Sequence, residues 1–345
     1  MRTTLTNIKV PLALMLSTLL IGLAGFMAAC TNRVSAGLPI NMADLTPQQL
    51  NFRGFIAYQG QPMNTFQLQE QNGYLFATGT PFDFIILNIS TDPENPVNIA
   101  DAKSQMNLFS PDPPFGGWSA ASFGSTALSI DGQYAVMSGS MGASVVDFQN
   151  IQNPQEIIRE PPPTSNLSVY SDSTYMWNGV VALGSLVFGF QMLNYNYVFG
   201  PLPQSLGIIG KNAYSTQSVC CVMGATYFAP LQQIFVAFRN QLVAYGLQYD
   251  SSGNFQNLYE VGAANTILAA YVTSSPHLLY VLHEPLYSGI SSPYPAGIYV
   301  YSSQYQLVGY LPLTPRVFAV SDDDSHLYAT DQNGNLSIYA INGAP

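Results

Sequence analysis

The stretch GYLFATGTPFDFIILNISTDPENPV, residues 73–97, decides the fold of this chain. It contains two short apolar runs, 74–77 and 85–89, joined by a tight link and followed by an Asp-Pro-Glu-Asn-Pro turn. Each run is too short, and too rich in aromatic and β-branched residues, to be a helix, so both are expected to be β-strands. The same pattern returns five more times, which makes the chain a repeat protein.

The two runs recur together at a period near fifty residues. Equivalent positions of the first run are 60, 45, 54, 45 and 48 residues apart, and they are Phe76, Val136, Val181, Phe235, Tyr280 and Tyr328. Short β-rich runs at this period predict the blades of a β-propeller. We therefore predict an all-β fold, a β-propeller most consistent with six blades, with seven as the alternative.

The two ends of the domain predict how the ring closes. The last repeat supplies three strands, at 317–320, 327–330 and 336–341, and so lacks a fourth. A spare strand, FRGFIAYQ at residues 52–59, stands at the start of the domain. We expect it to pair with 336–341, because such closure hides strand edges that would otherwise invite aggregation.

The first thirty residues have the layout of an export signal. A positive segment with Arg2 and Lys9 precedes an apolar segment, residues 11–29, which leads to Cys30. Such a signal is set aside from reasoning about the fold. We divide the chain into a signal peptide at 1–29, a tether at 30–50 and a single propeller domain at 51–345. An uncleaved transmembrane anchor is the alternative interpretation.

The sequence MAAC, which ends at Cys30, resembles the lipobox of bacterial lipoprotein signals. The resemblance implies cleavage before Cys30 and the attachment of diacylglycerol and N-acyl chains to that residue. Three chains would anchor the protein firmly, since each buried CH₂ adds about 0.8 kcal/mol. Thr31 in the next position implies sorting to the outer membrane, facing the periplasm or the cell surface.

Two of the repeats also resemble a known family. Residues 84–90 followed by 92–97, and 144–148 followed by 150–154, look like the LVIVP-type repeat of bacterial surface propellers. The last repeat, 323–340, is similar to the looser repeats of lactonase-like propellers. The resemblance implies a lipoprotein with a propeller fold and a surface location, and it implies no reaction.

The composition is unusually poor in charge. Charged residues make up 8% of the chain and the formal net charge is −10, so a nucleic-acid partner, which requires a basic surface, is not expected. Removal of Arg2 and Lys9 with the signal leaves 9 − 2 = 7 basic against 19 acidic residues. A chain with few bases gains little positive charge in acid, which favours an acidic periplasm or cell surface.

The longest links between the predicted strands, at 102–123, 207–223 and 284–296, fall mostly on one face of the propeller. Binding residues concentrate in the loops of rigid scaffolds, so we interpret this face as the binding face. The alternative is that these loops only plug the central channel. The binding-face candidates are Trp118, Tyr214, Cys220, Cys221, Arg239, His283, Glu284 and Tyr287.

Cys220 and Cys221 are neighbours in an exported chain, where disulfides are favoured. A vicinal disulfide would be strained, and strain of this kind clusters at functional sites. A soft-metal site and two reduced, buried thiols are the alternatives. No zinc-type spacing is present, and the sequence assigns no cofactor and no metal site.

Other polar residues give weaker signals. His283 and Glu284 could make polar contacts, but no nucleophile or acid partner is visible beside them. The run Asp322-Asp323-Asp324 is interpreted as a solvated turn, since its spacing is not that of a calcium loop. His277 and His326 begin equivalent strands, which indicates a role in the turns.

The leading hypothesis is therefore a lipid-anchored cell-envelope propeller that acts as a binding or scaffold module. Its partner would be an envelope protein or an exposed polymer. The alternative is an exported enzyme, a hydrolase or a quinoprotein-like oxidoreductase, with a site near Cys220 and Cys221. Fold alone does not decide between these two classes.

Overall fold

The structure is a computed structural model, and it describes Leu38 and residues 51–57, 64–80, 83–101, 125–139, 142–160, 178–191, 195–213, 222–265, 267–284, 292–331 and 335–342. Within these residues the regular structure is almost entirely β, with strands β1 to β24 and one single-turn 3₁₀ helix, η2 (Ala229–Leu231). No helix among the described residues is long and apolar enough to cross a membrane.

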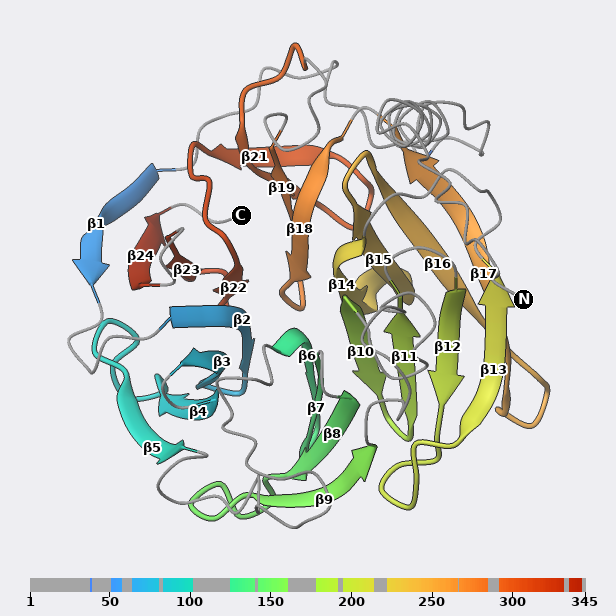
Figure 1. The fold of residues 1–345 in the computed structure, drawn as a ribbon. Helices are drawn as coiled ribbons and strands as arrows, with labels where there is room; N and C mark the ends of the chain where they lie inside the picture. Colours follow the sequence, from blue (N-terminus) through green and yellow to red (C-terminus); the bar gives the residue numbers. More distant parts are fainter. Residues whose placement is uncertain are drawn as a thin grey trace, which may run out of the picture.

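The strands form six sheets of four, arranged in a ring around a central axis (Figure 1). Each sheet is one blade, and its first strand lies innermost. Blade 1 is β2 (Asn64–Gln71), β3 (Tyr74–Thr80), β4 (Asp83–Asn88) and β5 (Val97–Asp101); blade 2 is β6 (Ser125–Asp131), β7 (Tyr134–Gly139), β8 (Gly142–Asp147) and β9 (Gln155–Glu160); blade 3 is β10 (Gly179–Leu183), β11 (Leu186–Phe190), β12 (Tyr195–Phe199) and β13 (Ile208–Ala213).

The second half of the ring repeats this order. Blade 4 is β14 (Val222–Phe228), β15 (Gln233–Phe238), β16 (Gln241–Tyr249) and β17 (Phe255–Ala264); blade 5 is β18 (Ala269–Ser274), β19 (Leu279–His283), β20 (Gly297–Tyr301) and β21 (Leu307–Leu311); blade 6 is β22 (Phe318–Val320), β23 (His326–Thr330), β24 (Leu336–Asn342) and β1 (Asn51–Ala57). The prediction of a six-bladed, all-β propeller is confirmed.

The two apolar runs of each repeat are the second and third strands of a blade. These strands lie in the middle of each sheet, and the adjacent blades pack against its two faces, so their side chains are mostly buried on both faces, as the near-continuous apolar runs predict. Tight turns join the first strand to the second. In blade 1 the turn is Asn72-Gly73, with φ of 54° and 76°, which is the backbone that an Asn-Gly hairpin turn favours.

The predicted closure of the ring is confirmed. β1 pairs antiparallel with β24, with Phe52 opposite Ile341 and Ile56 opposite Ile338. Figure 1 shows β1, in blue, beside β24, in red, at the edge of the sixth blade. The first strand of the domain therefore completes the last blade, which leaves six blades rather than seven.

The two faces of the ring differ in the links that they carry. The turn face, as we call it, carries the links from first to second strand and from third to fourth strand in each blade. The loop face carries the links from second to third strand and from each outer strand to the next blade. This follows from the antiparallel order of every sheet.

The central channel is crossed by the side chain of Tyr271, from the inner strand β18. Its ring lies 5.5 Å from the ring of Phe318 in blade 6, centroid to centroid, and its hydroxyl donates a hydrogen bond to Gln67 Oε1 in blade 1 at 3.2 Å. A Cβ on Gly224 in blade 4 would stand only 3.2 Å from the same ring. One side chain of blade 5 thus contacts the inner strands of three other blades.

Candidate functional site

Most of the residues proposed for the binding face lie outside the described part of the chain. Arg239, His283 and Glu284 are described. Those outside the described residues are Cys30, Trp118, Tyr214, Cys220, Cys221 and Tyr287. The state of the cysteine pair therefore stays a prediction.

His283 is buried, with none of its surface exposed. Its Nδ1 accepts a hydrogen bond from the backbone N–H of Leu268 at 3.0 Å, so the ring is neutral with its proton on Nε2, which lies 3.0 Å from Ser292 Oγ. Burial lowers the pKa of His283 to about 4. Both nitrogens are occupied, so the ring positions the link after β19 and is not accessible to a ligand in this structure.

The other two residues stand at loop-face ends of neighbouring blades. Arg239 follows β15 and is exposed. Glu284 follows β19, is half-buried, and its backbone N–H donates a hydrogen bond to Leu268 O at 3.1 Å. Burial raises the pKa of the Glu284 carboxyl. With His283 occupied, the three residues do not form a general acid–base set, which must reach one reacting atom.

A cleft opens instead on the turn face, between blades 1 and 2. Its volume is about 370 Å³, within the range of small-molecule and peptide sites. Its lining contains no charged residue. It consists of the amides Gln71, Asn72, Gln133 and Gln149, the aromatic residues Tyr74, Phe76 and Phe148, and Gly132 and Ile151.

The floor and the rim of the cleft have different chemistry. Phe76 and Phe148 are buried and pack with ring centroids 4.9 Å apart, so the floor is rigid and apolar. At the rim, Gln71 Nε2 donates a hydrogen bond to Gly132 O at 2.9 Å, and Gln133 Nε2 donates to Tyr134 Oη at 2.8 Å. The amide oxygens of these two glutamines face no partner among the described residues and can accept hydrogen bonds from a ligand.

A pair of carboxyl groups stands beside the cleft, at the seam between blades 1 and 6. Glu70 Oε1 accepts a hydrogen bond from Gly73 N–H at 2.8 Å, and Asp322 Oδ2 accepts one from Asn72 N–H at 3.2 Å. Burial, and then the charge of Asp322, raise the pKa of Glu70 to about 8. Glu70 Oε2 is buried without a hydrogen-bond partner among the described residues, and the raised pKa favours the protonated, neutral form of this carboxyl.

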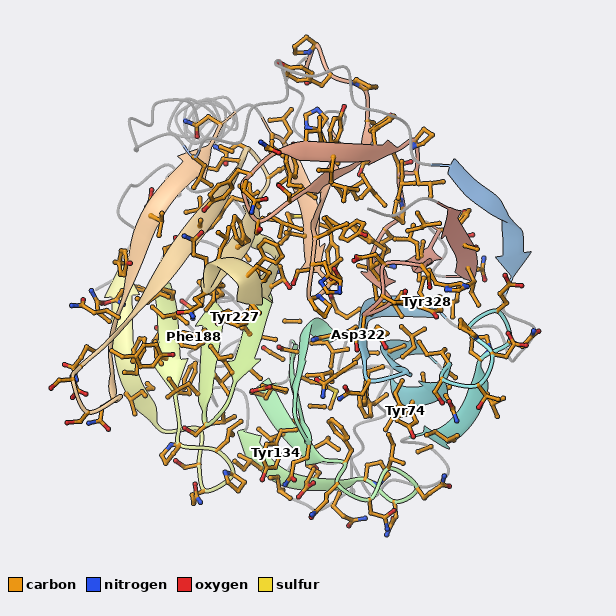
Figure 2. All side chains as sticks on the ribbon, turned by 180° about the vertical axis from the view of Figure 1, so that it is seen from behind. Tyr74, Tyr134, Phe188, Tyr227, Asp322 and Tyr328 are labelled. Atoms are coloured by element: carbon orange, nitrogen blue, oxygen red, sulfur yellow. The ribbon has the colours of Figure 1, made fainter. Side chains whose placement is uncertain are left out.

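Figure 2, seen from the opposite side to Figure 1, shows Asp322 near the centre of the ring, with Tyr74 and Tyr134 farther from it on blades 1 and 2. Neither Glu70 nor Asp322 lines the cleft. The hydrogen bond from Asn72 to Asp322 joins the first blade to the last, and the pair is placed to hold the ring together rather than to contact a ligand.

The run of aspartates is a solvated turn at two of its three positions, because Asp322 and Asp323 are exposed. Asp324 departs from that interpretation: it is 2% exposed and accepts a hydrogen bond from Tyr280 Oη at 2.8 Å, and burial raises its pKa. Asp323 Oδ1 accepts hydrogen bonds from the hydroxyl groups of Ser321 and Ser325 within the turn. Only the third aspartate is therefore drawn into the core, against blade 5.

Comparison with known proteins supports the fold. A solved structure from Bacteroides uniformis ATCC 8492, provisionally assigned as a 6-phosphogluconolactonase, superposes with a TM-score of 0.52 at 13% sequence identity. The match covers 83% of this chain and 84% of that one. In total 1194 chains of solved structures match, so the likeness identifies a widespread fold and carries no reaction. No protein-family model matches the sequence, and no curated protein does.

The described part of the molecule thus includes an open, uncharged cleft and a separate carboxyl pair, in which Glu70 is partly buried and Asp322 is exposed. The cleft was missed in the sequence because its residues come from two repeats about sixty positions apart. The sequence did contain one sign of the cleft: the equivalent turns at 71–74 and 131–134 each hold an amide one or two positions before a tyrosine.

Proposed function

We propose that this chain is a lipid-anchored cell-envelope propeller that acts as a binding module, with the uncharged cleft between blades 1 and 2 as its contact site. The anchor is the acylated Cys30, and the location is the outer membrane. Support for the anchor comes from the sequence, where an export signal ends in a lipobox-like MAAC. Support for the contact site comes from the geometry of the turn face.

The observation that carries the proposal is the lining of the cleft. Amide groups surround an aromatic floor, and no charge is present. Amides both donate and accept hydrogen bonds, as sugar hydroxyls do, and aromatic rings pack against apolar C–H surfaces. An uncharged, hydroxyl-rich envelope polymer fits this lining best. A strongly anionic ligand would meet no cation there, and the nearby Asp322 would repel it.

The experiment compares two exposed glutamines in the same turn. Gln149 lines the cleft and Gln152 does not, and both side chains are exposed. We expect Gln149→Glu to weaken co-sedimentation with the envelope polysaccharide fraction by about tenfold. The bound polymer would cover the new carboxylate without pairing it, and a tenfold loss corresponds to about 1.4 kcal/mol. Gln152→Glu is the matched control and should bind as the parent does.

The same assay separates the two kinds of partner. Neutral oligosaccharides should compete with the polysaccharide at the cleft. If only envelope proteins are captured, and sugars do not compete, the partner is an envelope protein and the polymer is ruled out. Equal binding by the parent and by Gln149→Glu would contradict the assignment of the cleft, whichever partner is captured.

The competing proposal is an exported enzyme with a site near Cys220 and Cys221 on the loop face. The solved structure that superposes on this chain is compatible with it through fold alone. The occupied state of His283 counts against a general base at that position. A hydrolase or oxidoreductase activity that disappears in Cys220→Ser/Cys221→Ser, with an unchanged melting temperature, would favour the enzyme over the binding module.

A further inference from the structure

Leu38, which belongs to the predicted tether, is fixed to the propeller. Its backbone N–H donates a hydrogen bond to Ala263 O at 3.0 Å, and its side chain is 8% exposed. It belongs to the apolar cluster of blades 4 and 5, which also includes Ala264 and Ile267. Because β17 runs from the turn face to the loop face and ends at Ala264, Leu38 is attached at the loop-face end of blade 4.

The reach of the chain before Leu38 is short. Leu38 stands eight residues after Cys30, so a fully extended chain spans at most about 28 Å, and a flexible one has a typical end-to-end distance of about 16 Å. The turn-face end of β17, at Phe255, is about 27 Å away from Ala263 along the strand. A lipid on Cys30 therefore reaches the level of the loop face easily, and that of the turn face only at full stretch.

Charge differs between the same two faces. Among the residues with described side chains, the loop-face ends of the blades carry the bases Lys211, Arg239 and Arg316 and the acids Glu284 and Asp331, so their charges nearly cancel. The turn face is strongly acidic, and its described acids include Glu70, Asp92, Glu94, Asp131, Asp147, Asp250, Asp322, Asp323 and Asp324. The described residues toward that face that are or can become positive include Arg53, which stands opposite Ala340 in β1, and His277 and His326.

An anionic phospholipid surface attracts Lys and Arg within about 8 Å at physiological salt and repels carboxylates. The tether and the charge distribution are independent observations, and both select the same orientation. We propose that the loop face of the propeller lies toward the lipid surface and that the turn face, with its uncharged cleft, points away from it. The proposal rests on the proposed acylation of Cys30. It implies that the partner binds the turn face, which points away from the lipid.

The test maps which face contacts lipid. The chain from Cys30 onward, with Cys220→Ser and Cys221→Ser, is coupled through Cys30 to a maleimide lipid in vesicles of phosphatidylethanolamine and phosphatidylglycerol. A lipid with a photoreactive headgroup is included, and crosslinked peptides are located by mass spectrometry. Peptides at 239–240 and 312–316 should crosslink about threefold or more above those at 92–95 and 250–254, because the short tether raises their effective concentration at the bilayer.

Two variants separate the role of Leu38 from that of overall stability. Leu38→Asp should release the tether and reduce the difference between the faces to about twofold or less, whereas Leu38→Val should keep it. A third variant, with twenty Gly/Ser residues inserted between Cys30 and Leu38, should also reduce the difference in crosslinking between the faces, without any change in the folded domain. Unaltered circular dichroism confirms folding in each case.

Turn-face peptides that crosslink as strongly as loop-face peptides in the parent chain would overturn the orientation. Because the coupling through Cys30 is chemical, this result is independent of acylation in the cell. Acylation itself is read from the mass of the protein purified from membranes. A protein that lacks the acyl mass therefore contradicts the anchor, and vesicle crosslinks on the wrong face contradict the orientation.

Discussion

Glu70 makes the stability of the ring depend on pH in a direction that is unusual for a carboxyl group. Its pKa is about 8 in the folded protein and 4.5 without the fold, because it is buried beside Asp322. The folded state thus binds the proton more tightly, so the stability that Glu70 contributes is fully present below pH 4.5 and is lost as the pH rises through 8. The full difference between the two pKa values corresponds to about 5 kcal/mol in the free energy of unfolding. About 2 kcal/mol of this stability is lost above pH 6.5.

The perturbation is Glu70→Gln, which keeps the shape of the side chain and removes its titration. We expect the melting temperature of the parent protein to fall by about 4 °C between pH 6.5 and pH 9, since about 2 kcal/mol is lost in a domain of this size. Glu70→Gln should melt at nearly the same temperature at both pH values. At pH 9 it should be more stable than the parent, because no second negative charge stands beside Asp322.

The window starts at pH 6.5 because folded His283, with a pKa of about 4, is neutral throughout it, and the unfolded histidine, with a pKa of 6.5, is charged only near its lower limit. Glu94→Gln, in an outer turn of the same blade, is the matched control and should leave the slope unchanged. Melting is followed by circular dichroism at several scan rates in each buffer. A parent protein whose melting temperature is flat from pH 6.5 to 9, or a slope that survives Glu70→Gln, would refute the raised pKa of Glu70.

Three further predictions concern other described residues. His283→Gln should reduce the loss of stability below pH 6.5, because the parent histidine must be charged while buried, at a cost of about 3 kcal/mol by pH 4; urea unfolding at pH 4 and pH 7 measures it. Tyr271→Ala should destabilise the fold by about 3–5 kcal/mol through the cavity left in the channel, whereas Tyr271→Phe should cost about 1 kcal/mol for the lost hydrogen bond to Gln67. Gly73→Ala should lower the melting temperature more than Gly132→Ala. Both positions have positive φ, but only at Gly73 would the new Cβ stand 2.7 Å from Ser90 Cβ. Equal losses in melting temperature would contradict this clash.

The acidic setting inferred from composition stays a prediction, and the titration of a few partly buried groups allows a related statement about stability. The carboxyls of Glu70 and Asp324 have raised pKa values because of burial, so they favour the folded protein as the pH falls. His283 acts in the opposite sense below pH 6.5. We therefore propose that stability is highest in mildly acidic solution, and the melting curves above test this directly.

The architecture could be predicted from the sequence because it depends on local patterns. The paired apolar runs are set by burial in the middle strands of each blade, and the spare strand at 52–59 was apparent once the strands were counted. These signals are periodic, so they survive the weak similarity among the repeats. Ring closure predicts which two strands pair, whereas their register, with Phe52 opposite Ile341, is seen only in the structure.

The candidate site could not be predicted in the same way, because its contacts join residues with no pattern between them. Glu70 and Asp322 meet only through the closed ring, and nothing local predicts that Asp322, an exposed turn residue, accepts a hydrogen bond from Asn72 in the first blade. Tyr271 is one of many aromatic residues in strands, and its position over Gly224 depends on the channel geometry. Leu38 lies in a segment without a strand pattern, so its attachment to Ala263 gave no signal in the sequence.

The pairing of β1 with β24 also sets the order of events as the chain is synthesised. The strand that is made first has no partner until the strand that is made last is available, so the sixth sheet stays incomplete while the rest of the chain emerges. Contacts so distant in sequence form slowly, because a long loop must close before they are gained. An unpaired edge is open to other chains throughout that interval. A holding chaperone would therefore protect this protein most at its first and last strands, and a C-terminally truncated product would remain unable to close.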